Sequence, residues 1–413
     1  MSSATYVRLA VSIAVAVSVF WLASRESIIY QALAPPFSAV VVFSLFFIML
    51  RTAVSLREIA GAFAMTVALW AVDARFLGYQ VGWGVYISIL GLAGLILLTY
   101  RVIWREGERR RIAIYALGSA LIFVGSEACT IPFLNWTSKA HPLVLDLYLY
   151  SFDASLRLQI PFLVGQFFEH SVGFMMVSFF VYWGLPIAIG MAFAGCLMSD
   201  RKSALPALVA MLIAGPLGVI CYNLYPALGP VHLFADRFPW HPLTTEQARR
   251  LFLEPVALAG YRNAIPSLHA TWMYLVCWYV RRLSVVERAG AAFFLFFTLC
   301  FTMGRGEHYF IDLIVALPFT VFVLALTNLL LGRGRGALVV PLLAGLGTTL
   351  GWLVALRFAI RTFWISPLIP WAACILTVVG SLWAGKKLLL LEREPEATAK
   401  TSFARVLAEG LRE

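Results

Sequence analysis

Charged residues are scarce in this sequence. Only 13% of its 413 residues are Asp, Glu, Lys or Arg, whereas 61% are hydrophobic. An ordinary soluble domain carries about 25% charged residues, and long polar stretches are also missing here from the first residues to about residue 385. This composition excludes a mainly soluble protein. It predicts an all-α fold, a polytopic transmembrane helix bundle.

Paired cysteines and clustered metal ligands are also missing. The six cysteines stand singly inside apolar runs, with no CxxC pair among them. Structural metal sites and redox motifs need such pairs or clusters. We therefore interpret the cysteines as small core residues and expect no metal and no cofactor.

Apolar stretches of span length recur along the chain, since one bilayer crossing takes about 20 mostly apolar residues. The first is followed by Ser24, Arg25 and Glu26 without a small-residue cleavage site, so we expect it to be retained as a helix. About twelve spans are predicted, at residues 5–24, 28–50, 59–76, 82–100, 112–133, 168–198, 204–224, 264–280, 288–303, 309–331, 337–356 and 364–385.

The net charge of +11 follows the expected topology. Basic residues gather in alternate connections, which is the positive-inside pattern and places both termini in the cytoplasm. The charge is thus no indication of a nucleic-acid partner. Connections 225–262 and 304–307 are predicted on the extracytoplasmic side of an inner or plasma membrane of bacterial type. The alternate, basic connections hold Arg51, Arg57, Arg101, Arg105, Arg109, Arg110, Arg111, Arg201, Lys202, Arg281, Arg282, Arg288, Arg333, Arg335, Lys386 and Lys387, and the C-terminal tail adds further basic residues.

The first segment with chemical potential, residues 261–270, leads directly into an apolar helix. Asn263 or Ser267 can cap this helix, and Pro266 suits a first helical turn. Free backbone N–H groups at a helix start favour an anion, and Arg262 adds a guanidinium that can bind phosphate oxygens in pairs. The segment therefore predicts a phosphate seat.

The second segment, residues 304–312, stands at the mouth of another predicted helix. His308 and Asp312 are four residues apart, so on a helix they share a face. The carboxylate can then hold one imidazole nitrogen and leave the other free to attack. One such pair arises easily by chance, but Asp312 falls just inside an apolar span, where a charged group is costly and usually functional.

The two segments support each other because both are predicted at one membrane face. His269 and His308 each lie near a helix start, beside Arg262 and Arg305 respectively. The plainer alternative is that His269 is a satisfied interfacial histidine and that the two arginines extend toward lipid headgroups. The combination favours a catalytic site.

These residues resemble a known family. Residues 265–269 (IPSLH) resemble the PSxH motif of the type 2 phosphatidic acid phosphatase superfamily, and residues 308–312 (HYFID) resemble its HxxxD motif. The variants are most similar to the branch that contains inositol phosphorylceramide synthase and sphingomyelin synthase. Residues 222–230 resemble the tyrosine- and proline-rich stretch that precedes PSxH in that branch.

The resemblance implies three regions in the chain. A six-helix phosphatase-like catalytic core would span residues 112–331, preceded by transmembrane helices of unknown role in 1–111. Residues 332–413 would hold two further transmembrane helices and a short cytoplasmic tail.

The resemblance also implies a metal-independent mechanism through a phosphohistidine. His308 would attack the lipid phosphorus while Asp312 orients it. His269 would protonate the departing oxygen as general acid and later activate the acceptor. Ser267 and the backbone beside it would hold the phosphoryl oxygens.

Phosphate ligands are where the sequence departs from that family. No lysine occurs between Lys202 and Lys386, and the arginine expected well before the catalytic histidine is missing. We add Arg262 and Arg305 as phosphate-binding residues from their charge and position.

Two classes of function stay open. One is a membrane enzyme that hydrolyses or transfers a lipid phosphoester, with a lipid phosphate and membrane lipids as its partners. The alternative is a non-enzymatic transporter or lipid-binding protein, although paired interruptions of corresponding helices, the usual pointer to a transport site, are not found.

Glu127 could serve function or helix packing. Asp146, Asp153, Glu169 and His170 are assigned no chemistry, because their stretch resembles an amphipathic interfacial segment.

Overall fold

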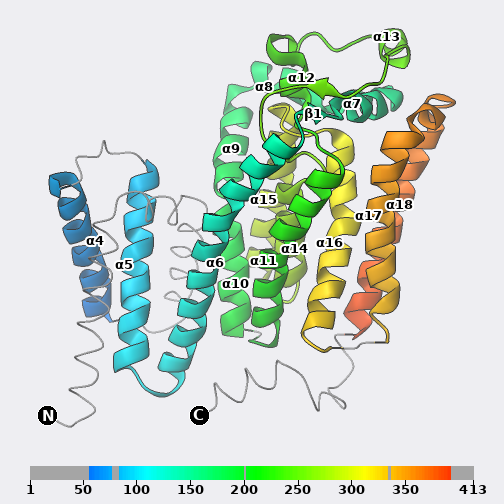
Figure 1. Cartoon of the computed structure of the whole chain (residues 1–413). Helices are drawn as coiled ribbons and strands as arrows, with labels where there is room; N and C mark the ends of the chain where they lie inside the picture. The colour runs from blue at the N-terminus through cyan, green and yellow to red at the C-terminus, as the bar shows by residue number, and fades with distance from the viewer. Residues whose placement is uncertain (1–54, 77–82, 200, 334–335, 392–413) are drawn as a thin grey trace, which may run out of the picture. The chain divides into compact units, whose positions relative to one another are not determined.

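The computed structural model describes residues 55–76, 83–199, 201–333 and 336–391, and it is mostly helical (Figure 1). The chain divides into two compact units, each described here by itself. The first unit comprises Met1–Pro132, Trp183–Ala204 and Arg282–Glu287, and the second comprises Phe133–Tyr182, Leu205–Arg281 and Arg288–Glu413.

An ion-pair cluster joins two helices of the first unit. Glu58, in the first turn of α4, accepts hydrogen bonds from Arg101 at 3.3 Å and from Arg105 at 3.0 Å, near the end of α5. The cluster thus fixes the start of one apolar helix against the end of the next. The helices of this unit are α4 (Leu56–Phe76), α5 (Trp83–Trp104), most of α6 (Gly107–Ala140) and α10 (Leu185–Ser199).

The second unit is a bundle of long helices with several short elements at one end (Figure 1). The long elements are α8 (Ile160–His170), α9 (Val172–Trp183), α11 (Arg201–Leu224), α14 (Leu268–Val280), α15 (Val285–Gly304), α16 (Phe310–Leu330), α17 (Val339–Phe358) and α18 (Leu368–Leu391). The short elements are α7 (Asp146–Ser155), α12 (Pro230–Phe234), η1 (Ala235–Arg237), α13 (Thr245–Arg249), η2 (Ile360–Trp364) and an antiparallel pair, β1 (Leu143–Val144) with β2 (Val256–Ala257).

Helix α16 is the most enclosed of the long apolar helices. Within its most apolar window 72% of residues are buried, against 28–50% for the other candidate spans. An all-round apolar helix needs cover on every side, in protein or in lipid. In the part of the chain that the structure describes, α16 obtains much of that cover from α14, α17 and α18.

Among the described residues, five helices are long and apolar enough to cross a membrane, or six if the bent pair α8–α9 counts as one span. Several such helices indicate an integral membrane protein. The predicted spans 5–24 and 28–50 lie outside the described residues, so the count of twelve and the six-helix core stay predictions.

The expected single helix over 168–198 is wrong. The chain bends by 116° between α8 and α9, and it breaks again between Trp183 and Leu185. Pro186 explains the second break, because a proline lacks the N–H of a continuing helix and its ring would clash with the carbonyl of Tyr182. Apolar composition alone did not reveal either interruption.

The contact between α16 and α17 depends on Gly345. A Cβ atom at this position would lie 2.5 Å from the Phe322 nitrogen and 2.8 Å from the Pro318 oxygen, both in the α16 backbone. We expect Gly345→Ala to lower the free energy of unfolding in detergent by about 1–3 kcal/mol, because the helices must move apart. Gly351→Ala is the control on the same helix, where a Cβ meets nothing within 4 Å. Equal stability of the two variants would contradict this packing.

Candidate active site

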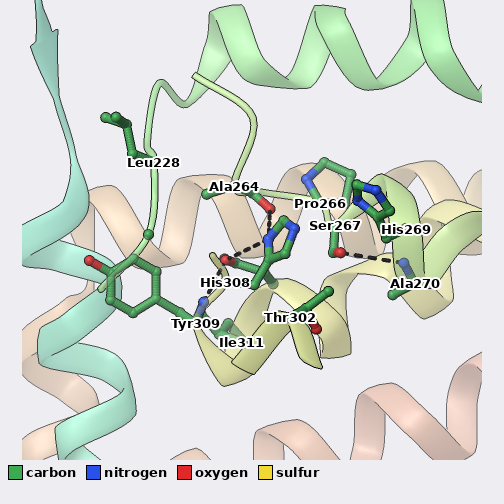
Figure 2. A network of polar contacts seen from close by, with 12 residues as sticks. Leu228, Ala264, Pro266, Ser267, His269, Ala270, Thr302, His308, Tyr309 and Ile311 are labelled. Carbon is green, nitrogen blue, oxygen red and sulfur yellow. Dashed lines mark hydrogen bonds and ion pairs between the residues drawn. The ribbon is translucent and has the colours of Figure 1, made fainter. Parts of the chain in front are cut away.

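His308 and Asp312 lie together at the start of α16, as their spacing predicts. The imidazole Nδ1 donates to the Ala264 carbonyl at 2.9 Å (Figure 2). The same nitrogen lies 3.4 Å from Asp312 Oδ2. Both acceptors therefore assign the proton to Nδ1. Nε2, which makes no hydrogen bond to any residue that the structure describes, keeps its lone pair. The arrangement is that of an oriented nucleophile.

The PSxH segment is joined to the HxxxD segment through the backbone. The Ser267 N–H donates to the Asp312 carbonyl at 3.3 Å, and the Ser267 hydroxyl accepts from Ala270 N at 3.4 Å as the N-cap of α14. Sequence pattern predicted Ser267 as one of two possible caps. The structure selects it, because residues 264–266 are not helical and α14 begins at Leu268.

His269, in the first turn of α14, stacks on the Tyr182 ring with a centroid separation of 4.4 Å. Figure 2 shows both imidazoles with Ser267 drawn between them. The structure thus brings four predicted site residues together: His308, Asp312, Ser267 and His269.

Residues 225–230, here called the strap, connect the two motifs. The Ala227 carbonyl of the strap accepts from the Ala264 N–H at 3.1 Å. Ala264 is also the residue whose carbonyl accepts from His308. Gly229 packs so closely on the turn before His308 that a Cβ atom would lie 2.5 Å from the Glu307 oxygen. Only glycine fits this approach, which is the physical reason for a glycine at this place in the strap.

Two buried carboxylates of α7 also belong to the site, and the sequence analysis gave them no role. Asp153 accepts from Phe310 N at 2.7 Å and from Ile311 N at 3.2 Å, the first amides of α16. Asp146 accepts from the Tyr309 hydroxyl at 3.1 Å and from two amides of the strap. The available signal was their spacing of seven residues, which put two acids on the apolar face of a short helix.

The two arginines differ sharply in their surroundings. Arg262 is buried, and its guanidinium donates to the carbonyls of His141, Pro142, Leu258 and Gly260. Arg305 is exposed on the turn three residues before His308. Phosphate binding by either one stays a prediction, and the hydrogen bonds of Arg262 favour a structural role.

Burial dominates the electrostatics of α7. It raises the pKa of Asp146 to about 7, although hydrogen bonds from Leu228, Gly229 and Tyr309 act in the opposite direction. Burial likewise raises the pKa of Asp153 well above its ordinary value. Among the described residues, no group of three or more His, Cys, Asp or Glu is arranged to hold a metal ion. The side chain of Glu127 lies outside the described part of the chain.

The fold and the site together define a class: an integral membrane protein with an oriented His–Asp pair at a helix start. Comparison with known families agrees, because residues 147–326 match the family model described as PAP2 superfamily. The matched region includes both motifs and confirms the resemblance at the level of the superfamily. No curated protein and no solved structure gave a significant match. The closer likeness to the inositol phosphorylceramide synthase and sphingomyelin synthase branch stays a prediction.

The raised pKa of Asp146 predicts a pH-dependent stability. A carboxyl group with a higher pKa in the folded chain stabilises the fold at low pH, and this contribution is lost as pH rises from about 4 to about 7. We expect the unfolding temperature of the wild type in detergent to fall more steeply over this range than that of Asp146→Asn, which cannot ionise. Parallel pH curves for the two proteins would contradict the assignment.

Proposed function

We propose that this protein is an integral membrane phosphoryl-transfer enzyme that acts on a lipid phosphoester through a phosphohistidine at the extracytoplasmic face. It would work either as a lipid phosphatase or as a phosphotransferase like inositol phosphorylceramide synthase. The superfamily match over 147–326 supports this class of reaction. The two outcomes differ only in whether water or an alcohol receives the phosphoryl group.

The observation that carries the proposal is the hydrogen bonding of His308. Its Nδ1 is held by the Ala264 carbonyl and Asp312, so Nε2 points away from both with a free lone pair. A buried imidazole held only for packing has no need of two acceptors on one nitrogen. This geometry supplies orientation and a counter-charge, which are the two requirements of a nucleophilic histidine.

The proposed reaction has two steps. In the first, Nε2 of His308 forms a bond to phosphorus, the bond from phosphorus to the lipid oxygen breaks, and His269 gives its proton to that oxygen. In the second, His269 takes a proton from water or an alcohol, the new oxygen–phosphorus bond forms, and the nitrogen–phosphorus bond breaks. Asp312 stabilises the positive charge on the His308 ring between the steps.

The phosphoryl oxygens need donors in both steps. Ser267 and the positive end of the α14 dipole are suited to this, since a helix start favours negative charge. The exposed Arg305 can reach toward the same anion from its turn. Positive and N–H donors of this kind stabilise the charge that spreads over the equatorial oxygens during phosphoryl transfer.

The decisive test is removal of the nucleophile. Purified His308→Ala should release no phosphate from a panel of phospholipids and isoprenoid pyrophosphates, and labelled phosphate should no longer be trapped on the protein. His241→Ala, at an exposed histidine of the 225–262 connection, is the control and should keep wild-type turnover. Unchanged turnover in His308→Ala would end the enzymatic hypothesis. Transport of an intact lipid by both variants would favour the alternative class.

The arginines can be separated by kinetics and stability. If Arg305 binds phosphate, Arg305→Ala should lower kcat/KM roughly 10–100-fold at an unchanged unfolding temperature, because a charged hydrogen bond contributes about 1.5–3 kcal/mol. Arg262→Ala should instead lower the unfolding temperature, because four carbonyls lose their donor. Arg237→Ala, at another exposed arginine of the same unit, is the control. Full activity in Arg305→Ala would remove it from the site.

A further inference from the structure

Helix α16 begins with its free amides already occupied. The Asp153 carboxylate accepts from Phe310 and Ile311 N–H, and Asp312 Oδ2 accepts from Tyr309 N at 2.8 Å. A helix start normally offers such amides to an external anion. Here two carboxylates of the protein accept from these amides. The start of α16 is therefore held in place by the protein itself and does not bind phosphate.

Asp146 holds the strap next to the start of α16. Its carboxylate accepts from the Tyr309 hydroxyl and from the amides of Leu228 and Gly229 at 2.9–3.2 Å. Asp146 and Asp153 are seven residues apart, so they lie two turns apart on one face of α7. A single short helix therefore holds both the strap and the start of α16.

The contacts of Asp153 and Asp146 hold the segments that carry the two partners of His308 Nδ1. Asp153 anchors the first turn of α16, which carries Asp312. Asp146 anchors the strap, where the Ala227 carbonyl accepts from the Ala264 N–H at 3.1 Å, and the Ala264 carbonyl is the other partner of the imidazole. Each carboxylate of α7 thus secures one of the two acceptors that orient the ring.

We propose that Asp146 and Asp153 are positioning residues for the His308 imidazole, acting through the strap and through the start of α16 respectively. Neither touches the ring itself. Burial of both carboxylates, at 0% and 2% exposure, explains why their contacts can be held rigidly. The catalytic part of the proposal rests on the function proposed above, whereas the anchoring does not.

The test compares Asp153→Asn and Asp146→Asn in the full chain, purified in detergent. An asparagine keeps one acceptor oxygen but puts an NH2 group toward a backbone N–H. Each substitution therefore removes at least one hydrogen bond that the aspartate accepts. Asp236→Asn, at an exposed aspartate, is the matched control. All three variants are monitored for their unfolding temperature, so that a collapsed protein is recognised.

Hydrogen–deuterium exchange measures the anchoring independently of activity. We expect Asp153→Asn to speed exchange in peptides that cover 306–314. Asp146→Asn should speed exchange in those peptides and also in peptides that cover 226–230 and 260–266. Asp236→Asn should change neither region. Unchanged exchange around His308 in both variants would overturn the proposal, whether or not any lipid is turned over.

Kinetics then measures the effect on the imidazole. A misplaced nucleophile should lower kcat for phosphate release roughly 10–100-fold while KM changes little, because ground-state binding of the lipid does not use His308. Faster exchange with an unchanged kcat would reduce the two carboxylates to structural residues and overturn the positioning role. A wild type that turns over no lipid would contradict the proposed function alone, and exchange would still decide the anchoring.

Discussion

The two contacts of His308 Nδ1, a hydrogen bond to the Ala264 carbonyl and an ion pair with Asp312, are the constraint around which the site is built. The two acceptors come from two segments: Asp312 belongs to α16, and Ala264 precedes α14. An imidazole can keep both contacts only if those two segments keep their positions relative to each other. The Ser267–Asp312 backbone contact, the strap and α7 all serve this requirement.

Carboxylates, and not apolar packing alone, meet that requirement around α16. Burying a polar group is costly unless it is hydrogen-bonded, and each carboxyl group of α7 accepts from at least two N–H or O–H donors. The result is a set of directional contacts that an aliphatic core cannot supply. The buried guanidinium of Arg262 is likewise satisfied by directional hydrogen bonds, here as the donor to backbone carbonyls.

Asp312 has an electrostatic consequence for the proposed reaction. Positive charge must develop on the His308 ring as Nε2 bonds to phosphorus. Asp312 lies 3.4 Å from Nδ1 and favours that charge. Burial raises the pKa values of the two α7 carboxyls, so Asp146 and Asp153 contribute hydrogen bonds to the framework and not charge to the ring.

Local pattern was enough to predict the two motifs, Ser267 as one of two possible caps, and most of the apolar helices in the described part of the chain. It was not enough for α7, because Asp153 meets Phe310 across 157 residues of sequence and nothing near either residue indicates the partner. The same limit applies to Arg262, because the His141 and Pro142 carbonyls that accept from its guanidinium lie 121 and 120 residues away in sequence. The break before Pro186 had a local signal, but continuous hydrophobicity outweighed it.

The last two helices gain a role from this arrangement, although they follow the region that matches the superfamily. The Phe152 ring of α7 packs on Trp352 and Phe363, and Trp364 Nε1 donates to the Ser151 hydroxyl at 2.9 Å. Trp371 Nε1 donates to the Leu156 carbonyl just beyond α7.

Helix α17, η2 and helix α18 therefore all contact α7 or the residue just after it, and α17 and α18 also contact α16. Since Asp146 and Asp153 can hold the strap and the α16 start only while α7 itself is held, these helices are part of the framework of the site. An amphipathic segment that looked interfacial in the sequence is instead enclosed, by the site and by the C-terminal helices.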